Sequence, residues 1–171
     1  MKHLIALAVV TASLGLSACG FTPLYAQPGV VSNLASIDVV APQGRTGYLL
    51  REELDDAFAR NRAGAAAYRM NLAISEQRFP RGIRTDNVAT RYEYVLIADY
   101  ILARLPSGEV AKKGKVRVEL TYDSADQPYA SITAQQDAQE RAAEEAARRI
   151  QLELAAWLAD GAPAPGAKTK G

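Results

Sequence analysis

Histidine and cysteine are nearly absent from this 171-residue sequence, which holds one of each, His3 and Cys19. Both lie in a stretch that reads as a secretory leader, with a short basic start followed by an apolar run from Leu4 to Leu16. This run is too short for a membrane-spanning helix, which needs about 20 residues. We therefore expect residues 1–18 to be a signal peptide. The remaining domain then has no histidine and no free thiol, which excludes Ser-His-Asp and Cys-His nucleophiles, His/Cys zinc sites and redox CxxC pairs.

An excess of charge of one sign is also lacking. Lys and Arg total 20 against 19 Asp and Glu, which gives a formal net charge of +1. Such a balance argues against a nucleic-acid partner for the molecule as a whole. With 49% hydrophobic and 23% charged residues, the composition is that of a single globular domain and not of a disordered or collagen-like chain.

Motifs for catalysis are equally scarce. The adjacent carboxylates Glu52/Glu53, Asp55/Asp56 and Glu144/Glu145 fall on the polar sides of expected amphipathic helices, which is typical of a solvated face. No Gly-rich phosphate motif and no calcium loop is present. We expect a protein that is not an enzyme and that uses no cofactor and no metal. A carboxylate-dependent envelope hydrolase is the weaker alternative.

Cys19 itself ends the segment Leu16-Ser17-Ala18-Cys19, which resembles the bacterial lipobox at all four positions. In that motif the thiol accepts a diacylglycerol and the cysteine becomes the mature N-terminus. Ordinary cleavage that leaves one stray cysteine is the alternative. Because Gly20, and not Asp, follows the cysteine, we expect a lipid-anchored protein on the periplasmic side of the outer membrane.

The hydrophobic periodicity predicts an α+β fold in the order β-α-β-β-β-α. We expect a two-layer sandwich, in which a four-stranded, mainly antiparallel sheet carries two helices on one face. Thr46 is the expected N-cap of the first helix and Gly64 its expected stop. The pairing of the first strand stays open. The expected elements are strands at 37–40, 68–79, 90–105 and 116–122, and helices at 47–61 and 129–158.

The domain organisation follows from these elements. Residues 19–35 form a lipidated N-terminal tether, and residues 36–160 form the single α/β sandwich domain. Residues 161–171 contain only Ala, Pro, Gly, Lys and Thr and are expected to be a disordered tail.

Two groups of basic residues stand out. The first is expected near a loop over residues 81–87, and the second on the adjacent hairpin. If both groups meet at one edge or end of the sheet, they suit a phosphorylated amphiphile, because Arg and Lys bind phosphates beside an apolar surface. The alternative is ordinary solvation of an edge strand, where Lys blocks edge-to-edge pairing. The groups are Arg78, Arg81, Arg84 and Arg91, and Lys112, Lys113, Lys115 and Arg117.

Several segments together resemble the lipopolysaccharide-assembly lipoprotein family LptE (rare lipoprotein B) in its alphaproteobacterial form. The resemblance rests first on the N-terminal segment of residues 19–25, CGFTPLY. It is carried further by Thr90-Arg91-Tyr92, by Ser124 through Ala130, and by Asp137-Ala138 followed by Arg141.

This resemblance implies two helices on a four-stranded sheet. It also implies a plug subunit inside the β-barrel LptD, which assists barrel assembly and the insertion of lipopolysaccharide into the outer leaflet. Lipopolysaccharide-binding candidates are Arg78, Arg81, Arg84, Arg91, Lys112, Lys113 and Lys115. The alternative is a stand-alone periplasmic lipid-binding or transport-adaptor lipoprotein.

Overall fold

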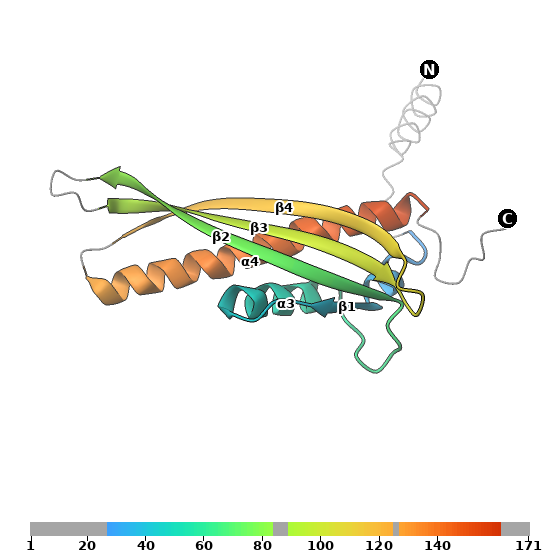
Figure 1. Cartoon of the computed structure of the whole chain (residues 1–171). Helices are drawn as coiled ribbons and strands as arrows, with labels where there is room; N and C mark the ends of the chain where they lie inside the picture. The colour runs from blue at the N-terminus through green and yellow to red at the C-terminus, as the bar shows by residue number, and fades with distance from the viewer. Residues whose placement is uncertain (1–26, 84–88, 125–126, 162–171) are drawn as a thin grey trace, which may run out of the picture.

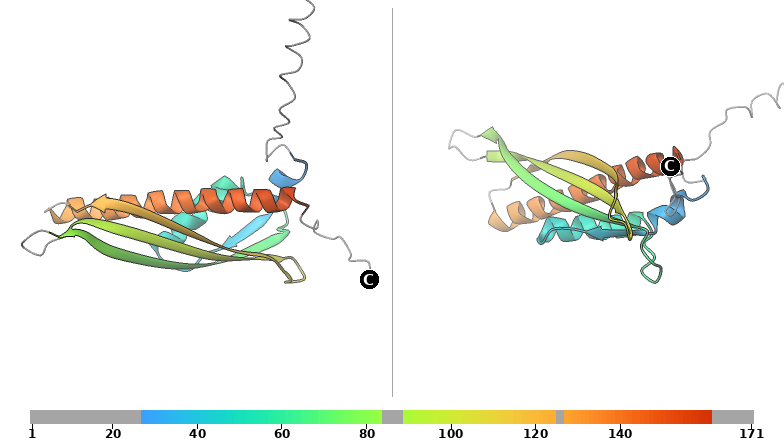
Figure 2. Two further views of the ribbon diagram at one scale, coloured as in Figure 1. Left: turned by 90° about the horizontal axis from the view of Figure 1, so that it is seen from above. Right: turned by 45° about the vertical axis from the view of Figure 1, so that its right-hand side comes forward.

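Two layers make up the computed structural model, which describes residues 27–83, 89–124 and 127–161 (Figure 1). One layer is a four-stranded sheet and the other consists of helices on a single face of it (Figure 2). The elements are α2 (Val30–Leu34), β1 (Ile37–Val40), α3 (Arg45–Ala57), β2 (Tyr68–Ile83), β3 (Ala89–Arg104), β4 (Val110–Asp123) and α4 (Pro128–Ala159). The expected α+β sandwich is thereby confirmed. The expected signal peptide, Cys19, Arg84 and residues 162–171 of the expected tail lie outside the described residues.

The sheet has the strand order β1-β2-β3-β4. β1 pairs in parallel with β2, from Ile37 opposite Tyr68 to Val40 opposite Asn71, while the other neighbours pair in an antiparallel manner. The pairing of the first strand, which the sequence left open, is therefore parallel to β2. α3 is the crossover connection that a parallel pair needs. β2 continues for twelve residues past its last partner in β1.

Alternation along β3 shows how the core is built. Tyr94, Leu96, Ala98, Tyr100 and Leu102 are buried and face the helices. α4 meets this face with a stripe made mostly of alanine, whose small side chains let a 32-residue helix lie close to the sheet along its length. Its buried residues are Ala138, Ala142, Ala143, Ala146, Ala147, Ile150, Leu154 and Ala155.

The start of α3 differs from expectation. The helix begins at Arg45, and Gly44 is its N-cap with no side-chain capping bond. Thr46 lies inside the first turn and is 3% exposed, so its hydroxyl is buried in the core instead of capping the helix end. The helical stripe of Leu50 and Leu54 is confirmed, since both side chains are fully buried.

The end of α3 differs as well. The helix stops at Ala57, and Ala59 takes the left-handed conformation with φ 49°. The N–H of Ala59 donates to the Asp56 carbonyl (2.9 Å) and the N–H of Arg60 donates to the Asp55 carbonyl (3.0 Å). These two bonds form a Schellman motif, in which glycine is the usual left-handed residue. The expected stop at Gly64 was wrong because an alanine occupies that role earlier in the chain.

Two strands are longer than predicted. β2 continues through Arg81 to Ile83, where a loop was expected, and β4 begins at Val110 instead of Val116. In the first half of β4, two positions that face the helices carry no apolar side chain, so the sequence there lacks the alternation of apolar and polar residues that predicts a strand. Lys112 pairs there with Glu153 of α4 (3.5 Å), and Gly114 lies opposite Tyr100.

The short helix α2 was not predicted at all. It lies in the segment interpreted as a tether, yet Val30 and Leu34 are buried in the core, and the helix packs against α4. The packed part of the chain therefore starts before residue 36. A five-residue helix is too short for its apolar spacing to predict it from sequence.

Candidate functional site

The two basic groups are separated along the sheet: Arg91 lies near one end, Lys112 and Lys113 lie toward the other, and Lys115 and Arg117 lie near the middle of β4. In the strand register, Arg91 lies opposite Asp123 of β4, whereas Lys115 lies opposite Asp99. Eight residues of β3 separate these two positions, which corresponds to about 26 Å along the strand. The expectation that the groups meet at one edge or end was therefore wrong. Sequence reasoning missed the separation because β4 is longer than its apolar alternation suggests.

The lysine group is itself divided between the two faces. Lys112 points toward α4, and its Nζ lies 3.5 Å from Glu153. Lys115 points to the opposite face, with its Nζ 3.2 Å from Asp99. Lys113 shares the face of Lys115 and is exposed. This group therefore forms no single cationic surface.

The arginine group gathers at the end of the sheet where β2, β3 and β4 meet the first turns of α4 (Figure 1). We call this end the distal tip. Arg81 and Arg91 are brought together there on the outer face, directly opposite each other in the register, whereas Arg78, opposite Tyr94, lies on the other face of the same end. The tip consists of Arg78, Phe79, Arg81, Arg91, Tyr92, Tyr122, Tyr129 and Ile132.

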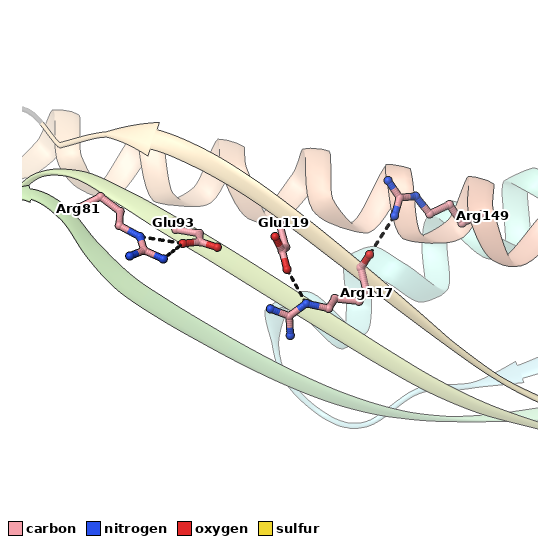
Figure 3. A network of polar contacts seen from close by, with 5 residues as sticks. All are labelled: Arg81, Glu93, Arg117, Glu119 and Arg149. Atoms are coloured by element: carbon pink, nitrogen blue, oxygen red, sulfur yellow. Dashed lines mark hydrogen bonds and ion pairs between the residues drawn. The ribbon is translucent and has the colours of Figure 1, made fainter.

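Two tip arginines are held by carboxylates on the outer face of the sheet. The Nε of Arg81 donates to Glu93 (2.8 Å, Figure 3), and the Nε of Arg91 donates to Asp123 (2.8 Å). The arginine side chains are 59% and 57% exposed, respectively. Solvent-exposed pairs of this kind contribute little net stability. An incoming phosphate can therefore replace either carboxylate at little cost to the fold.

Arg78 is held in a different way, on the face that looks toward α4. Its guanidinium donates to the side-chain carbonyl of Gln135 (2.5 Å) and lies 5.1 Å from the centroid of the Tyr92 ring. Tyr92 in turn stacks on Tyr122, with the ring centroids 5.6 Å apart. Among the described residues, no carboxylate forms an ion pair with Arg78, so this cation is pre-positioned by neutral groups. In the sequence, Tyr92 and Tyr94 are two residues apart on one predicted strand, and this spacing indicates that both rings lie on the same face of it.

Exposed apolar side chains lie beside these cations. Tyr129 is 86% exposed, Ile132 54% and Phe79 41%. Tyr129 and Ile132 are three residues apart on α4, so they lie on the same face of its first turns. The distal tip thus combines cations that can bind phosphate with an apolar surface that can contact acyl chains.

A partly buried hydrogen bond connects two strands of the sheet next to the tip. The hydroxyl of Tyr94, a residue that is 3% exposed, donates to Glu76 (2.6 Å), and Gln139 of α4 donates to the same carboxylate (3.1 Å). Burial, and then the bond to Glu76, raise the pKa of Tyr94 above its usual value. The phenol therefore stays a neutral donor that ties β2, β3 and α4 together.

Of the carboxylates considered for catalysis, Asp55 of α3 and Glu145 of α4 lie in ion pairs with arginines. Asp55 lies 3.0 Å from Arg62 and 4.0 Å from Arg51. A surface hollow of about 400 Å³ runs over these side chains and is bordered by Tyr48 and Asp56. In the part of the chain that the structure describes, no group of His, Cys, Asp and Glu is placed to hold a metal ion, and no helix is long and apolar enough to cross a membrane.

The fold and the site together define the class of this protein. It is a small two-layer α+β domain that follows a lipobox-like leader and has a cationic and aromatic tip. Among solved structures, a lipoprotein from Caulobacter crescentus CB15 is similar, with 57% identity over 80% of this chain and 99% of that one (TM-score 0.69). The LptE family model, described as lipopolysaccharide-assembly, matches residues 34–154. The chain belongs to the LptE family.

More distant structures agree in fold. The rare lipoprotein B from Shewanella oneidensis has 17% identity and a TM-score of 0.56, over 72% of this chain and 95% of that one. Lipoprotein B from Nitrosomonas europaea has 14% identity and a TM-score of 0.54, over 73% and 84%. A search of curated proteins gives no match. The expected family is thus confirmed, and with it a lipoprotein of lipopolysaccharide assembly.

Proposed function

We propose that this chain is an outer-membrane lipoprotein that serves as the plug subunit of an LptD β-barrel. In this role it assists assembly of the barrel and insertion of lipopolysaccharide into the outer leaflet, and it has no catalytic activity. The observation that carries the proposal is the family match, which spans residues 34–154 and so covers almost the whole packed domain. Mixed charges on the outer face of the sheet, such as Lys115, Arg117 and Glu119, suit the polar lumen of a large barrel.

Extraction in mild detergent tests the partnership. The full-length chain, carrying an affinity tag and expressed at its normal level, is expected to co-purify with a large β-barrel protein. Recovery of the lipoprotein alone, with surface lipopolysaccharide unchanged after its depletion, would instead support the stand-alone lipid-binding or transport-adaptor lipoprotein.

Attachment to the membrane is proposed to occur through acyl chains on Cys19. Three acyl chains, as bacterial lipoproteins carry, exceed the two signals that stable anchoring requires. Cys19→Ala is expected to abolish labelling by a fatty-acid analogue and to leave the leader uncleaved or cleaved at a different position. Retained labelling would refute lipidation at this position.

We also propose that the distal tip binds the phosphates of lipopolysaccharide. Arg78→Glu/Arg91→Glu reverses two charges at the tip and is expected to reduce binding of purified lipopolysaccharide more than tenfold, since charge-assisted bonds to phosphate are lost. Lys113→Glu/Lys115→Glu is the matched control, because it reverses two charges on β4 that lie away from the tip. Equal losses in both variants would mean that net charge, and not the tip, determines binding. Circular dichroism verifies that both variants are folded.

A further inference from the structure

Two glutamines of α4 lie over two oppositely charged residues of β2. The side-chain carbonyl of Gln135 accepts a hydrogen bond from the guanidinium of Arg78 (2.5 Å), and the amide nitrogen of Gln139 donates to the carboxylate of Glu76 (3.1 Å). The two glutamines are four residues apart, so they lie on the same face of α4. Glu76 and Arg78 are two residues apart, so they lie on the same face of β2. Neutral amides therefore contact both charges.

These contacts keep Glu76 and Arg78 from pairing with each other. The Glu76 carboxylate also accepts a hydrogen bond from the hydroxyl of Tyr94 (2.6 Å), so two neutral donors hold it. The Arg78 guanidinium lies 5.1 Å from the centroid of the Tyr92 ring, which attracts the cation through its π face. Arg78 is exposed, and its contacts with the described residues are with neutral groups. Its positive charge is therefore not neutralised by a paired carboxylate there.

The two arginines on the outer face of the tip are held differently. Arg81 pairs with Glu93 (Figure 3), and Arg91 pairs with Asp123, with 2.8 Å between Nε and Oδ1. A phosphate that binds either arginine must replace this carboxylate or share the guanidinium with it, and two anions beside one cation repel each other. At Arg78 the phosphate meets only an amide carbonyl, which carries no net charge. Of these three arginines, Arg78 is the one that can bind an anion without breaking an ion pair.

The contact with Gln135 orients the guanidinium and leaves donors free. A guanidinium has five N–H donors and no acceptor, so it is the oxygen of the Gln135 amide that faces Arg78. This bond uses the Nη1 group of Arg78, and the remaining donors suit the oxygens of a phosphate. The next carboxylates along α4, Asp137 and Glu140, pair with Arg141 and Arg45. The helix therefore positions Arg78 through an amide and directs its own acidic residues to other partners.

We propose that Gln135 is a positioning residue for phosphate binding. It holds the Arg78 guanidinium through a neutral contact, so that Arg78, and not the carboxylate-paired Arg81 or Arg91, makes the principal contact with a phosphate of the amphiphile. This inference rests on the proposed binding of lipopolysaccharide phosphates at the distal tip, and it names the residue pair that determines the affinity there. A carboxylate at position 135 would make Arg78 a paired arginine like the other two.

Gln135→Glu tests this role, because it keeps the shape of the side chain and adds a carboxylate that can pair with Arg78. Gln136→Glu is the matched control, since it adds the same charge in the same turn of α4 at an exposed residue. Both variants are also made in an Arg78→Gln background. Binding of the full-length chain, purified in detergent, is measured with purified lipopolysaccharide and with the same preparation after removal of its phosphates. Circular dichroism verifies that every variant is folded.

Gln135→Glu is expected to weaken binding of intact lipopolysaccharide about fivefold, the factor that corresponds to the upper range for an exposed ion pair, and Gln136→Glu less than about twofold. In the Arg78→Gln background, and with the dephosphorylated preparation, the two variants are expected to bind equally. If the parent chain prefers intact lipopolysaccharide, equal effects of the two variants would overturn the role of Gln135, and so would a larger effect of Gln135→Glu that persists without Arg78. A parent chain that binds both preparations equally would instead refute phosphate binding at the tip, and this inference with it.

Discussion

Gly114 gives the sharpest test of how the core is packed. A Cβ added at this position would lie 2.3 Å from the Cζ and the hydroxyl oxygen of Tyr100, where ordinary contact begins at 3.4 Å. Tyr100 is 1% exposed, so the ring has no free space to enter. The Gly114→Ala variant therefore forces the ring or the strand to move by about 1 Å or more, as expected for an overpacked core.

The magnitude follows from two opposing terms. Overpacking costs about 1–3 kcal/mol, and replacing glycine in a strand recovers about 0.5–1 kcal/mol of backbone entropy. Gly114→Ala is thus expected to lower the free energy of unfolding by about 1 kcal/mol, within a range of about 0–2.5 kcal/mol. Gly64→Ala is the control: its added Cβ meets Asn61 only at the ordinary contact distance of 3.5 Å, so we expect no loss of stability.

Urea unfolding followed by circular dichroism measures these values, and constant m-values ensure that the variants are compared on one scale. A double-mutant cycle isolates the contact. In a Tyr100→Leu background, Gly114→Ala is expected to cost less than about 0.5 kcal/mol, so that the coupling energy is about 1 kcal/mol. If Gly114→Ala costs the same in both backgrounds, the clash with Tyr100 is not the cause and the reasoning fails.

Three further changes test other parts of the structure. Ala59→Gly relieves the left-handed alanine at the end of α3 and is expected to stabilise the protein by about 0.5–1 kcal/mol, because that conformation costs an L-residue about 1–2 kcal/mol; a lower Tm would contradict this. Burial, and then the charge of Glu144, raise the pKa of Glu53 above 4.5. Glu53 is therefore expected to destabilise the fold when ionised. Glu53→Gln should raise the Tm at pH 7 and lose this advantage as the pH falls through the raised pKa toward 4.5, and an advantage independent of pH would refute the cause. Tyr94→Phe removes the bond to Glu76 and should cost about 1–2 kcal/mol in urea unfolding; an unchanged midpoint would show that the bond contributes nothing.

Local periodicity predicted most of the fold. Alternation over Tyr68–Ile74 and the i, i+4 spacing of Leu50, Leu54 and Phe58 are confirmed by the buried faces of β2 and α3. Where the prediction failed, the local structure depends on a contact with a residue far away in the sequence, and the neighbouring residues show no pattern that indicates it. Val30 and Leu34 form a helix because α4 covers them, and Lys112 occupies an inward position because Glu153 reaches it. Such partners are far apart in the sequence, so no window of neighbouring residues contains them.

The residues of the candidate site could likewise be predicted only in part from local sequence patterns. The sequence supplied the arginines, the tyrosines and the lipobox-like segment, but no local pattern could place Lys112 and Lys113 toward the end of β4 that lies away from Arg91. The contact between Arg78 and the Tyr92 ring joins two strands, and only the register of β2 on β3 creates it.

The sequence by itself determined the class of fold, the near absence of histidine and cysteine chemistry, and the family. These properties follow from composition, from motifs read in order, and from periodicities set by the geometry of a single helix or strand. Tertiary structure alone decided the parallel pairing of β1, the separation of the two basic groups and the open edge of β2. Each of these depends on which strand lies beside which and in what register, and that is settled by packing between residues that are distant along the chain.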